Sequence, residues 1–128
     1  MKDKKRSYKD LIVWQKADKL FHMVADDVSR WPNTNIAKAI SFQVLDSAGS
    51  VSTNISEGYG RGGSKEFRQY FRQSRGSLTE TDNWLYKAMK RGFITQRRYN
   101  NEYTPLIEEI SKLTTTWIGR LSRQARRK

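Results

Sequence analysis

The stretch SKEFRQYFRQSRGSLTETDNWLYKAMKR, residues 64–91, decides the fold of this chain. Its apolar and small residues recur at alternating intervals of four and three, a heptad-like seam that is typical of a helix in a bundle. The members of the seam are Phe67, Phe71, Ser74, Leu78, Thr81, Leu85 and Ala88. Ser64 suits a helix N-cap and Gly92 suits the residue that ends a helix, so we predict one long helix between them.

A row of basic residues follows the same helix on an adjacent face, at intervals of three, four and three. These residues are Lys65, Arg68, Arg72 and Arg75. The chain as a whole has 25 basic and 13 acidic residues and a net charge of +12, and most of the positive charge lies in residues 1–9, 61–98 and 118–128. Clustered charge of this kind attracts phosphate backbones through counterion release, without reading base sequence.

Helical spacing recurs in three other segments, whereas the long alternating runs that indicate strands are absent. The first segment spans residues 10–29, with Asp10 as its N-cap and Pro32 preventing continuation. The second spans residues 35–57, and its small residues around Gly49 are expected to let a neighbouring helix approach closely. The predicted apolar stripes are Trp14, Ala17, Phe21, Val24 and Val28 in the first segment, and Ile36, Ile40, Val44, Ala48, Val51 and Ile55 in the second.

The last helical segment begins near Thr95 and contains Pro105, which lacks the N–H that a helix interior needs. Either the helix kinks there, or a short piece ends and a second begins with Thr104 as its cap and Pro105 at its first position. The apolar residues of this segment are Tyr103, Ile107, Ile110, Leu113, Trp117 and Leu121. Four amphipathic helices with short connections predict an all-α fold, an antiparallel up-down-up-down four-helix bundle.

The motif EGYGRGGSKEF, residues 57–67, has the G-x-G-x-x-G spacing of a dinucleotide-binding loop. Such a loop requires a buried strand before it and a βαβ unit around it, whereas the preceding SAGSVSTNIS has helical spacing. We therefore interpret the glycines as a connection between the second and third helices, with Gly58 closing the second. A phosphate contact where the third helix opens, between Arg61 and Lys65, remains an alternative.

We expect three parts: a basic tail at residues 1–9, the bundle at 10–122 and a second basic tail at 123–128. The predicted nucleic-acid-binding residues combine the basic row of the third helix, one arginine before it and a second row on the last helix. They are Arg61, Lys65, Arg68, Arg72, Arg75, Arg120, Arg123 and Arg127. The apolar run at residues 11–14 is too short for a signal peptide or a membrane span, and cysteine is absent, so we expect a cytoplasmic protein.

The inventory of catalytic residues is thin. His22 is the only histidine, and neither a nucleophile elbow nor the Glu-x-x-His pattern of di-iron bundles occurs. The acidic pairs at residues 26–27 and 108–109 consist of adjacent residues, which diverge around a helix instead of converging on a metal ion. We expect no enzymatic activity, no cofactor and no metal.

Three blocks of this chain resemble a known bacterial family. YKDLIVWQKA (residues 8–17) and STNISEGYGR (52–61) resemble the two signature blocks of the 23S rRNA intervening-sequence proteins, and GSLTETDNWL (76–85) resembles the third-helix block of that family. The likeness spans residues 7–121. Pro105 and the high positive charge depart from the family pattern.

The resemblance implies an antiparallel four-helix bundle, often assembled as a ring-shaped homopentamer, with no established enzymatic activity. The chain is also similar in architecture to the accessory variability determinant of diversity-generating retroelements, a basic pentameric bundle that binds a reverse transcriptase and nucleic acid; TTTWIGRLSR (114–123) resembles its C-terminal end. The signature residues are expected to be structural or to lie at a subunit interface, where aromatic residues are enriched. They are Tyr8, Trp14, Asn54, Glu57 and Tyr59.

Two functions follow from these observations. The first is a non-enzymatic bundle that binds nucleic acid through its phosphates, with RNA preferred over DNA because of the family association. The second is a protein-interaction scaffold or accessory subunit that docks an acidic partner or a reverse transcriptase.

Overall fold

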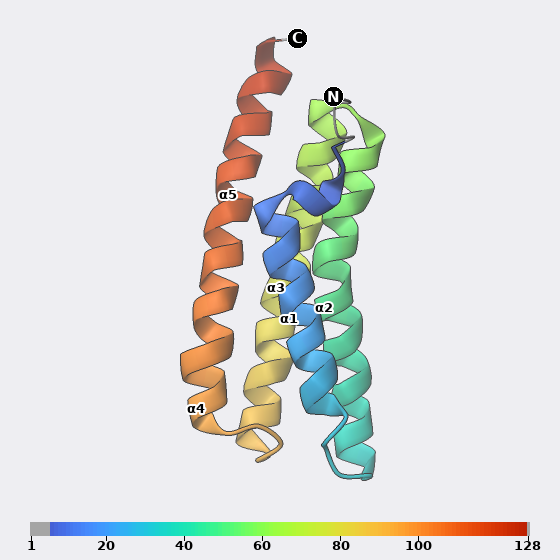
Figure 1. Ribbon diagram of the computed structural model, residues 1–128, viewed down its shortest axis with the longest axis vertical. Coiled ribbons are helices and arrows are strands. Elements are labelled where there is room, and N and C mark those ends of the chain that lie inside the picture. Colours follow the sequence, from blue (N-terminus) through green and yellow to red (C-terminus); the bar gives the residue numbers. More distant parts are fainter. Residues whose placement is uncertain (1–5, 128) are drawn as a thin grey trace, which may run out of the picture.

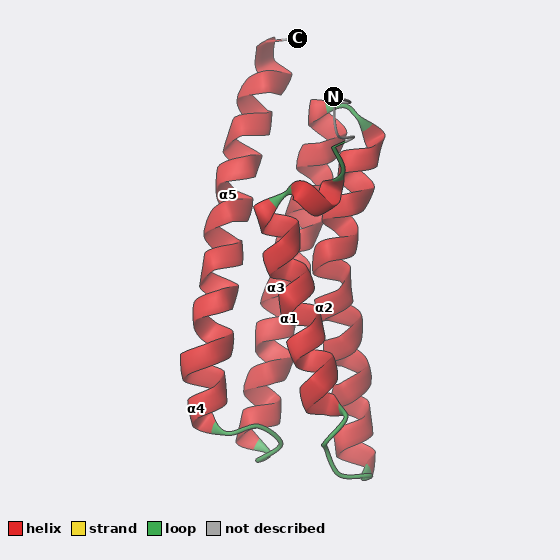
Figure 2. Ribbon diagram, in the orientation of Figure 1, coloured by secondary structure: helices red, strands yellow, loops and turns green. Residues whose placement is uncertain are grey.

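The computed structural model describes residues 6–127, and the outermost parts of both predicted basic tails, residues 1–5 and 128, lie outside them. Every regular element among the described residues is helical (Figure 2). Four of the elements are long helices, and the three short ones are η1, α4 and the π-helical turn η2. The bounds are η1 (Tyr8–Asp10), α1 (Ile12–Val28), α2 (Asn35–Arg61), α3 (Ser64–Lys90), α4 (Gln96–Arg98), η2 (Tyr99–Tyr103) and α5 (Thr104–Arg127).

The long helices form the predicted bundle, and successive helices run in opposite directions (Figure 1). Buried hydrogen bonds between α2 and α3 fix this direction, because Ser74 Oγ donates to the Val51 carbonyl at 2.8 Å and Thr81 Oγ1 donates to Ser47 Oγ at 3.0 Å. A later residue of α3 thus meets an earlier residue of α2. α2 packs against α1 and α3, and α5 closes the bundle against α3 and α1.

The seam that predicts α3 is the inner face of that helix. Six of its seven members are buried, and Phe67 is half-buried. Its two polar members, Ser74 and Thr81, satisfy their hydroxyls on α2 and on the preceding turn of α3, as buried polar groups must.

The buried stripe of α1 shares Ala17 and Val24 with the predicted one, and its other members lie one residue before the predicted ones. Val13, Ala17, Leu20, Val24 and Asp27 are buried, while Trp14, Phe21 and Val28 are half-buried at its edge. The prediction of Asp10 as N-cap of α1 is wrong: Ser7 caps the preceding turn η1, and the Asp10 carboxylate accepts from the Ser7 N–H at 2.9 Å in a reciprocal capping box.

The glycine-rich segment is mostly helix, which corrects two predictions. α2 continues to Arg61, so Gly58 lies within the helix, and Gly62, with φ of 81°, takes the left-handed conformation that ends it. Ser64 is the first residue of α3 and not its cap, a position that Gly63 takes without a side-chain bond. Gly58 is needed for packing instead, because a Cβ there would lie 2.7 Å from the Tyr70 Cβ.

Pro105 is the second residue of α5 and follows the π-helical turn η2 directly, so Thr104 is the first helical residue and not a cap outside the helix. Thr104 has helical torsion angles, and its N–H donates to the Tyr99 carbonyl five residues earlier, so the chain makes one π turn before the proline. This wider turn accommodates a residue that cannot donate a backbone hydrogen bond. α5 then runs as helix to Arg127.

Candidate nucleic-acid interface

The predicted basic rows of α3 and α5 lie at the same end of the bundle. α3 begins and α5 ends there, as the antiparallel arrangement requires (Figure 1). Ser64 Oγ donates to Gln124 Oε1 at 3.2 Å, and Arg68 Nη1 donates to Ser122 Oγ at 3.4 Å, so the two helices are in contact at this level. Arg61, in the last turn of α2, lies close to the start of α3. We call this surface the cationic end; it comprises Arg61, Lys65, Arg68, Arg72, Arg75, Arg120, Arg123 and Arg127.

Most side chains of the cationic end are exposed, and Arg68 is the exception. Arg68 is half-buried between α3 and α5, and its Nε is buried without a hydrogen-bond partner among the described residues. Its aliphatic stem therefore contributes to packing, as long cationic side chains often do. Arg68 is thus the least suitable position for testing charge alone.

The acidic side chains of the described residues do not neutralise this surface. Arg61 forms an exposed pair with Glu57 at 3.5 Å. Within residues 6–127, none of the other cations of the cationic end takes part in an ion pair. The last eleven described residues, 117–127, contain four arginines and no acid. Unpaired, exposed cations on neighbouring helices leave a surface potential that favours polyanions.

A stack of aromatic rings lies beneath the cationic end. The rings of Phe71 and Trp117 are nearly parallel with centroids 5.5 Å apart, and Phe67 packs on both. The guanidinium of Arg120 lies over the Trp117 ring, 4.8 Å from its centroid. Trp117 is therefore half-buried, packed against two phenylalanine rings and one guanidinium. The apolar register of α5 identified Trp117 as core, but its contact with Arg120 was not foreseen.

Two of the signature residues, Tyr8 and Trp14, lie on η1 and α1, and the other three lie on α2. Tyr8 and Trp14 pack edge to face at 5.2 Å, beside a cavity of about 270 Å³ that Gly49 and small hydroxyl residues of α2 complete. Asn54 donates to the Ser50 carbonyl within α2, and Glu57 pairs with Arg61. Tyr59 meets the Phe67 ring edge-on at 6.1 Å. Each of the five therefore has a contact within the chain.

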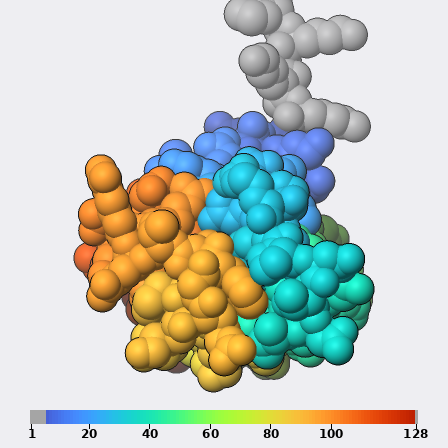
Figure 3. Space-filling view, turned by 90° about the horizontal axis from the view of Figure 1, so that it is seen from below, coloured from blue at the N-terminus to red at the C-terminus, as the bar shows by residue number. Residues whose placement is uncertain are grey.

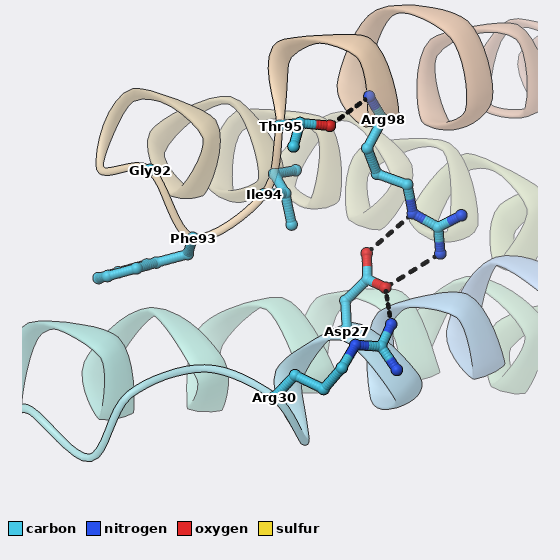
Figure 4. A pocket seen from close by; sticks show the side chains of 7 residues that line it. All are labelled: Asp27, Arg30, Gly92, Phe93, Ile94, Thr95 and Arg98. Carbon is cyan, nitrogen blue, oxygen red and sulfur yellow. Dashed lines mark hydrogen bonds and ion pairs between the residues drawn. The ribbon is translucent and has the colours of Figure 1, made fainter.

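The sequence did not reveal the most heavily bonded charged group, Asp27 near the end of α1 (Figure 4). Its carboxylate, 7 % exposed, accepts two hydrogen bonds from Arg98, one from Arg30 and one from the Tyr103 hydroxyl, all between 2.7 and 3.0 Å. The Asp27 hydrogen bond raises the pKa of Arg98, and burial followed by the same carboxylate raises the pKa of Tyr103.

The Asp27 cluster fastens α1 to α4 and η2. One signal for it was present in the sequence, because Asp27 continues the spacing of Val13, Leu20 and Val24 on the buried side of α1. It borders a cavity of about 380 Å³. Since all four donors converge on one satisfied carboxylate, we interpret the cluster as a structural clamp.

Metal-binding clusters and membrane-spanning helices do not occur among residues 6–127. In the part of the chain that the structure describes, no group of three or more metal-binding side chains comes together. None of the described helices has the length and apolar character to cross a bilayer.

The chain matches one family model by sequence, and its fold matches a solved structure. No curated protein matches the chain. A crystal structure of a protein with unknown function, from the S23 ribosomal protein family of Bacteroides thetaiotaomicron, is 22 % identical; it covers 84 % of this chain and 98 % of its own, with a TM-score of 0.76. At that identity the likeness supports the fold alone. Residues 9–116 match the family described as 23S rRNA-intervening sequence protein, and because that match covers most of the chain, the chain belongs to this family.

Proposed function

We propose that this protein is a non-enzymatic nucleic-acid-binding bundle that holds the phosphates of structured RNA on its cationic end. One observation carries the proposal: cations from three helices gather at one end of a rigid bundle, and all but Arg61 lack an acidic partner among the described residues. The name of the family associates it with 23S rRNA, which favours RNA over DNA.

The dimensions of the cationic end suit a helical nucleic acid. At a rise of about 1.5 Å per residue, the row from Lys65 to Arg75 is about 15 Å long and the row from Arg120 to Arg127 about 10 Å long. A duplex carries roughly one phosphate charge per 1.7 Å of its axis, so several phosphates lie within reach of both rows. Binding of this kind depends on salt and on backbone shape and tolerates changes of base sequence.

The test is the affinity for a labelled RNA hairpin, measured by fluorescence anisotropy across a salt series. Arg72→Gln combined with Arg123→Gln removes one exposed cation from each row. The matched control, Lys19→Gln with Lys38→Gln, removes the same net charge from exposed positions on α1 and α2. We expect the slope of log K against log salt to decrease by about 1.4 to 1.8 in the first variant and to stay unchanged in the control.

Two outcomes would contradict the proposal. A wild-type affinity that does not respond to salt excludes phosphate contacts as its source. Equal changes in both variants would show that net charge matters and the position of the cations does not. The same hairpin made of DNA tests the preference for RNA.

A homopentamer is the assembly we propose, as the family resemblance implies. Large apolar side chains on the outside support self-association, above all Phe42 on α2, which is 71 % exposed, and Ile12 at the start of α1. Light scattering should then give five times the chain mass of 15.0 kDa.

The alternative function is a scaffold or accessory subunit that docks another protein, such as a reverse transcriptase. A partner that co-purifies after nuclease treatment and high salt would favour it.

A further inference from the structure

A second surface at the opposite end of the bundle combines aromatic rings with positive charge. The last turns of α3 and the segment leading into α4 border a groove of about 730 Å³ (Figure 3 looks onto this end, with α3 in gold and α4 in orange). Tyr86, Met89 and Tyr99 supply its apolar lining together with Ile94. Its volume lies within the ~300–1,000 Å³ of small-ligand sites.

The two tyrosines form a fixed corner in this groove. Their rings meet edge to face, with centroids 6.0 Å apart and an interplanar angle of 66°. The Tyr99 hydroxyl donates to Asp82 at 2.7 Å, which holds that ring in place, and Tyr86 is 45 % exposed. An exposed ring supported from the side is an arrangement on which a planar group can stack without reordering the protein.

The chain segment that follows Tyr86 is basic, and the carboxylate at the corner, Asp82, is the one that accepts from Tyr99. Residues 87–98 contain five basic side chains and no acidic one. Arg98 is occupied by Asp27 and Glu102, whereas Lys90, Arg91 and Arg97 are exposed and form no ion pair within residues 6–127. The Lys90 ammonium lies 6.0 Å from the centre of the Tyr86 ring. An exposed aromatic ring with a cation beside it, on a basic segment, is the combination that binds single-stranded nucleic acid.

We propose that this groove binds an unpaired nucleotide of RNA, its base stacked on Tyr86 and its phosphates held by Lys90 and the neighbouring arginines. The side-chain amides of Gln96 and Asn100 border the groove and supply donors and acceptors for a base edge. The cationic end differs, because Trp117 is half-buried against Phe67 and Phe71, whereas Tyr86 is exposed. The two ends therefore recognise different features: a phosphate backbone at one, an unpaired base at the other.

The test compares two probes on the full-length protein. One is a labelled oligouridylate of about twelve nucleotides, within the ~4–16 of known single-strand sites, and the other is a blunt RNA duplex of similar length. Tyr86→Leu keeps an apolar side chain and removes the ring. Tyr86→Phe keeps the ring and serves as the conservative variant.

We expect Tyr86→Leu to weaken oligouridylate binding about 5- to 150-fold, the range for one lost stacking contact, and to change duplex binding by less than about twofold. Tyr86→Phe should bind like the wild type. The groove proposal is overturned if Tyr86→Leu affects both probes equally, or neither, or if the wild type does not bind oligouridylate.

These outcomes separate the groove from the cationic end, although the proposal extends the nucleic-acid function argued above. Loss of duplex binding in Arg72→Gln with Arg123→Gln, alongside selective loss of oligouridylate binding in Tyr86→Leu, supports two sites. If Tyr86→Leu loses only oligouridylate binding and Arg72→Gln with Arg123→Gln leaves the duplex affinity unchanged, the proposal for the cationic end is overturned and the groove proposal stands.

Discussion

Asp27→Asn tests whether the carboxylate cluster at the end of α1 is a structural clamp. Asparagine has nearly the same shape but no charge, and its amide nitrogen presents hydrogens to donors that need an acceptor. The single amide oxygen can accept on one side only, so either Tyr103 and Arg98 Nε or Arg30 and Arg98 Nη2 lose their acceptor, and Arg98, 25 % exposed, keeps only the Glu102 carboxylate. Asp27→Asn therefore breaks a buried ion pair together with the hydrogen bonds that support it.

The expected cost of Asp27→Asn follows from that burial. Removing one partner of a buried ion pair costs about 3–5 kcal/mol, and this range already includes the stranded charge. At an m-value of about 2 kcal/mol/M, the midpoint of urea unfolding should fall by roughly 1.5–2.5 M. Asp26→Asn is the matched control, because Asp26 is the exposed neighbour and its carboxylate forms no ion pair among the described residues. Its unfolding free energy should stay within about 0.5 kcal/mol of wild type.

Urea unfolding followed by circular dichroism gives the answer directly. If Asp27→Asn lies within about 1 kcal/mol of the wild type, the cluster is not a clamp and the reasoning from burial fails. The double change Asp27→Leu with Arg98→Met adds a check, since replacing both charges by apolar groups is often neutral or stabilising. Recovery in the double variant assigns the cost of the single one to the stranded charge.

Two further predictions concern stability. Burial, followed by the Asp82 hydrogen bond, raises the pKa of Tyr99 to about 12 from its usual 10. The neutral phenol therefore stabilises the folded state. This contribution to the free energy of unfolding is fully present below pH 10 and is lost as the pH rises to about 12. Urea unfolding at several alkaline pH values should therefore show the wild type losing its advantage over Tyr99→Phe across this window. Gly58→Ala should destabilise by about 1–3 kcal/mol because its Cβ overlaps Tyr70, whereas Gly60→Ala, with open space around it, should stabilise by up to about 1 kcal/mol; equal effects would contradict the packing at Gly58.

The sequence predicted the bundle because α3 carries an unambiguous period. In α3 the spacing of four and three places six residues in the core without reference to any other segment. In α1 the same spacing selected Trp14 and Phe21, but the buried stripe passes through Val13 and Leu20. Adjacent apolar residues fit the same spacing, and large rings at the edge of a stripe cover apolar surface while remaining half-exposed, so spacing alone did not separate the two.

The candidate sites were only partly visible for a related reason. Spacing within one helix placed Lys65 and Arg75 on a common face, and antiparallel order alone brings the end of α5 to them. Two of the three residues that bond Asp27 lie 71 and 76 residues away, and a pattern within one helix contains no information about such contacts. The same holds for Tyr86 and Tyr99, which face each other because the turn after α3 reverses the chain.

The cationic end costs the folded protein stability, and that cost is itself an argument for function. Arg68 and Arg72 are four residues apart on α3, as are Arg123 and Arg127 on α5, and like charges at this spacing destabilise a helix by about 0.2–0.5 kcal/mol per pair. The antiparallel packing then brings both rows to one end, with no acid in the last turns of α5 to offset them. The fold and the solubility of the bundle do not require that arrangement, because a surface with basic and acidic residues interspersed would be equally soluble. A bound polyanion relieves the repulsion between these cations. Each neutralised cation then contributes to the affinity for the polyanion and to the stability of the folded protein while the polyanion is bound.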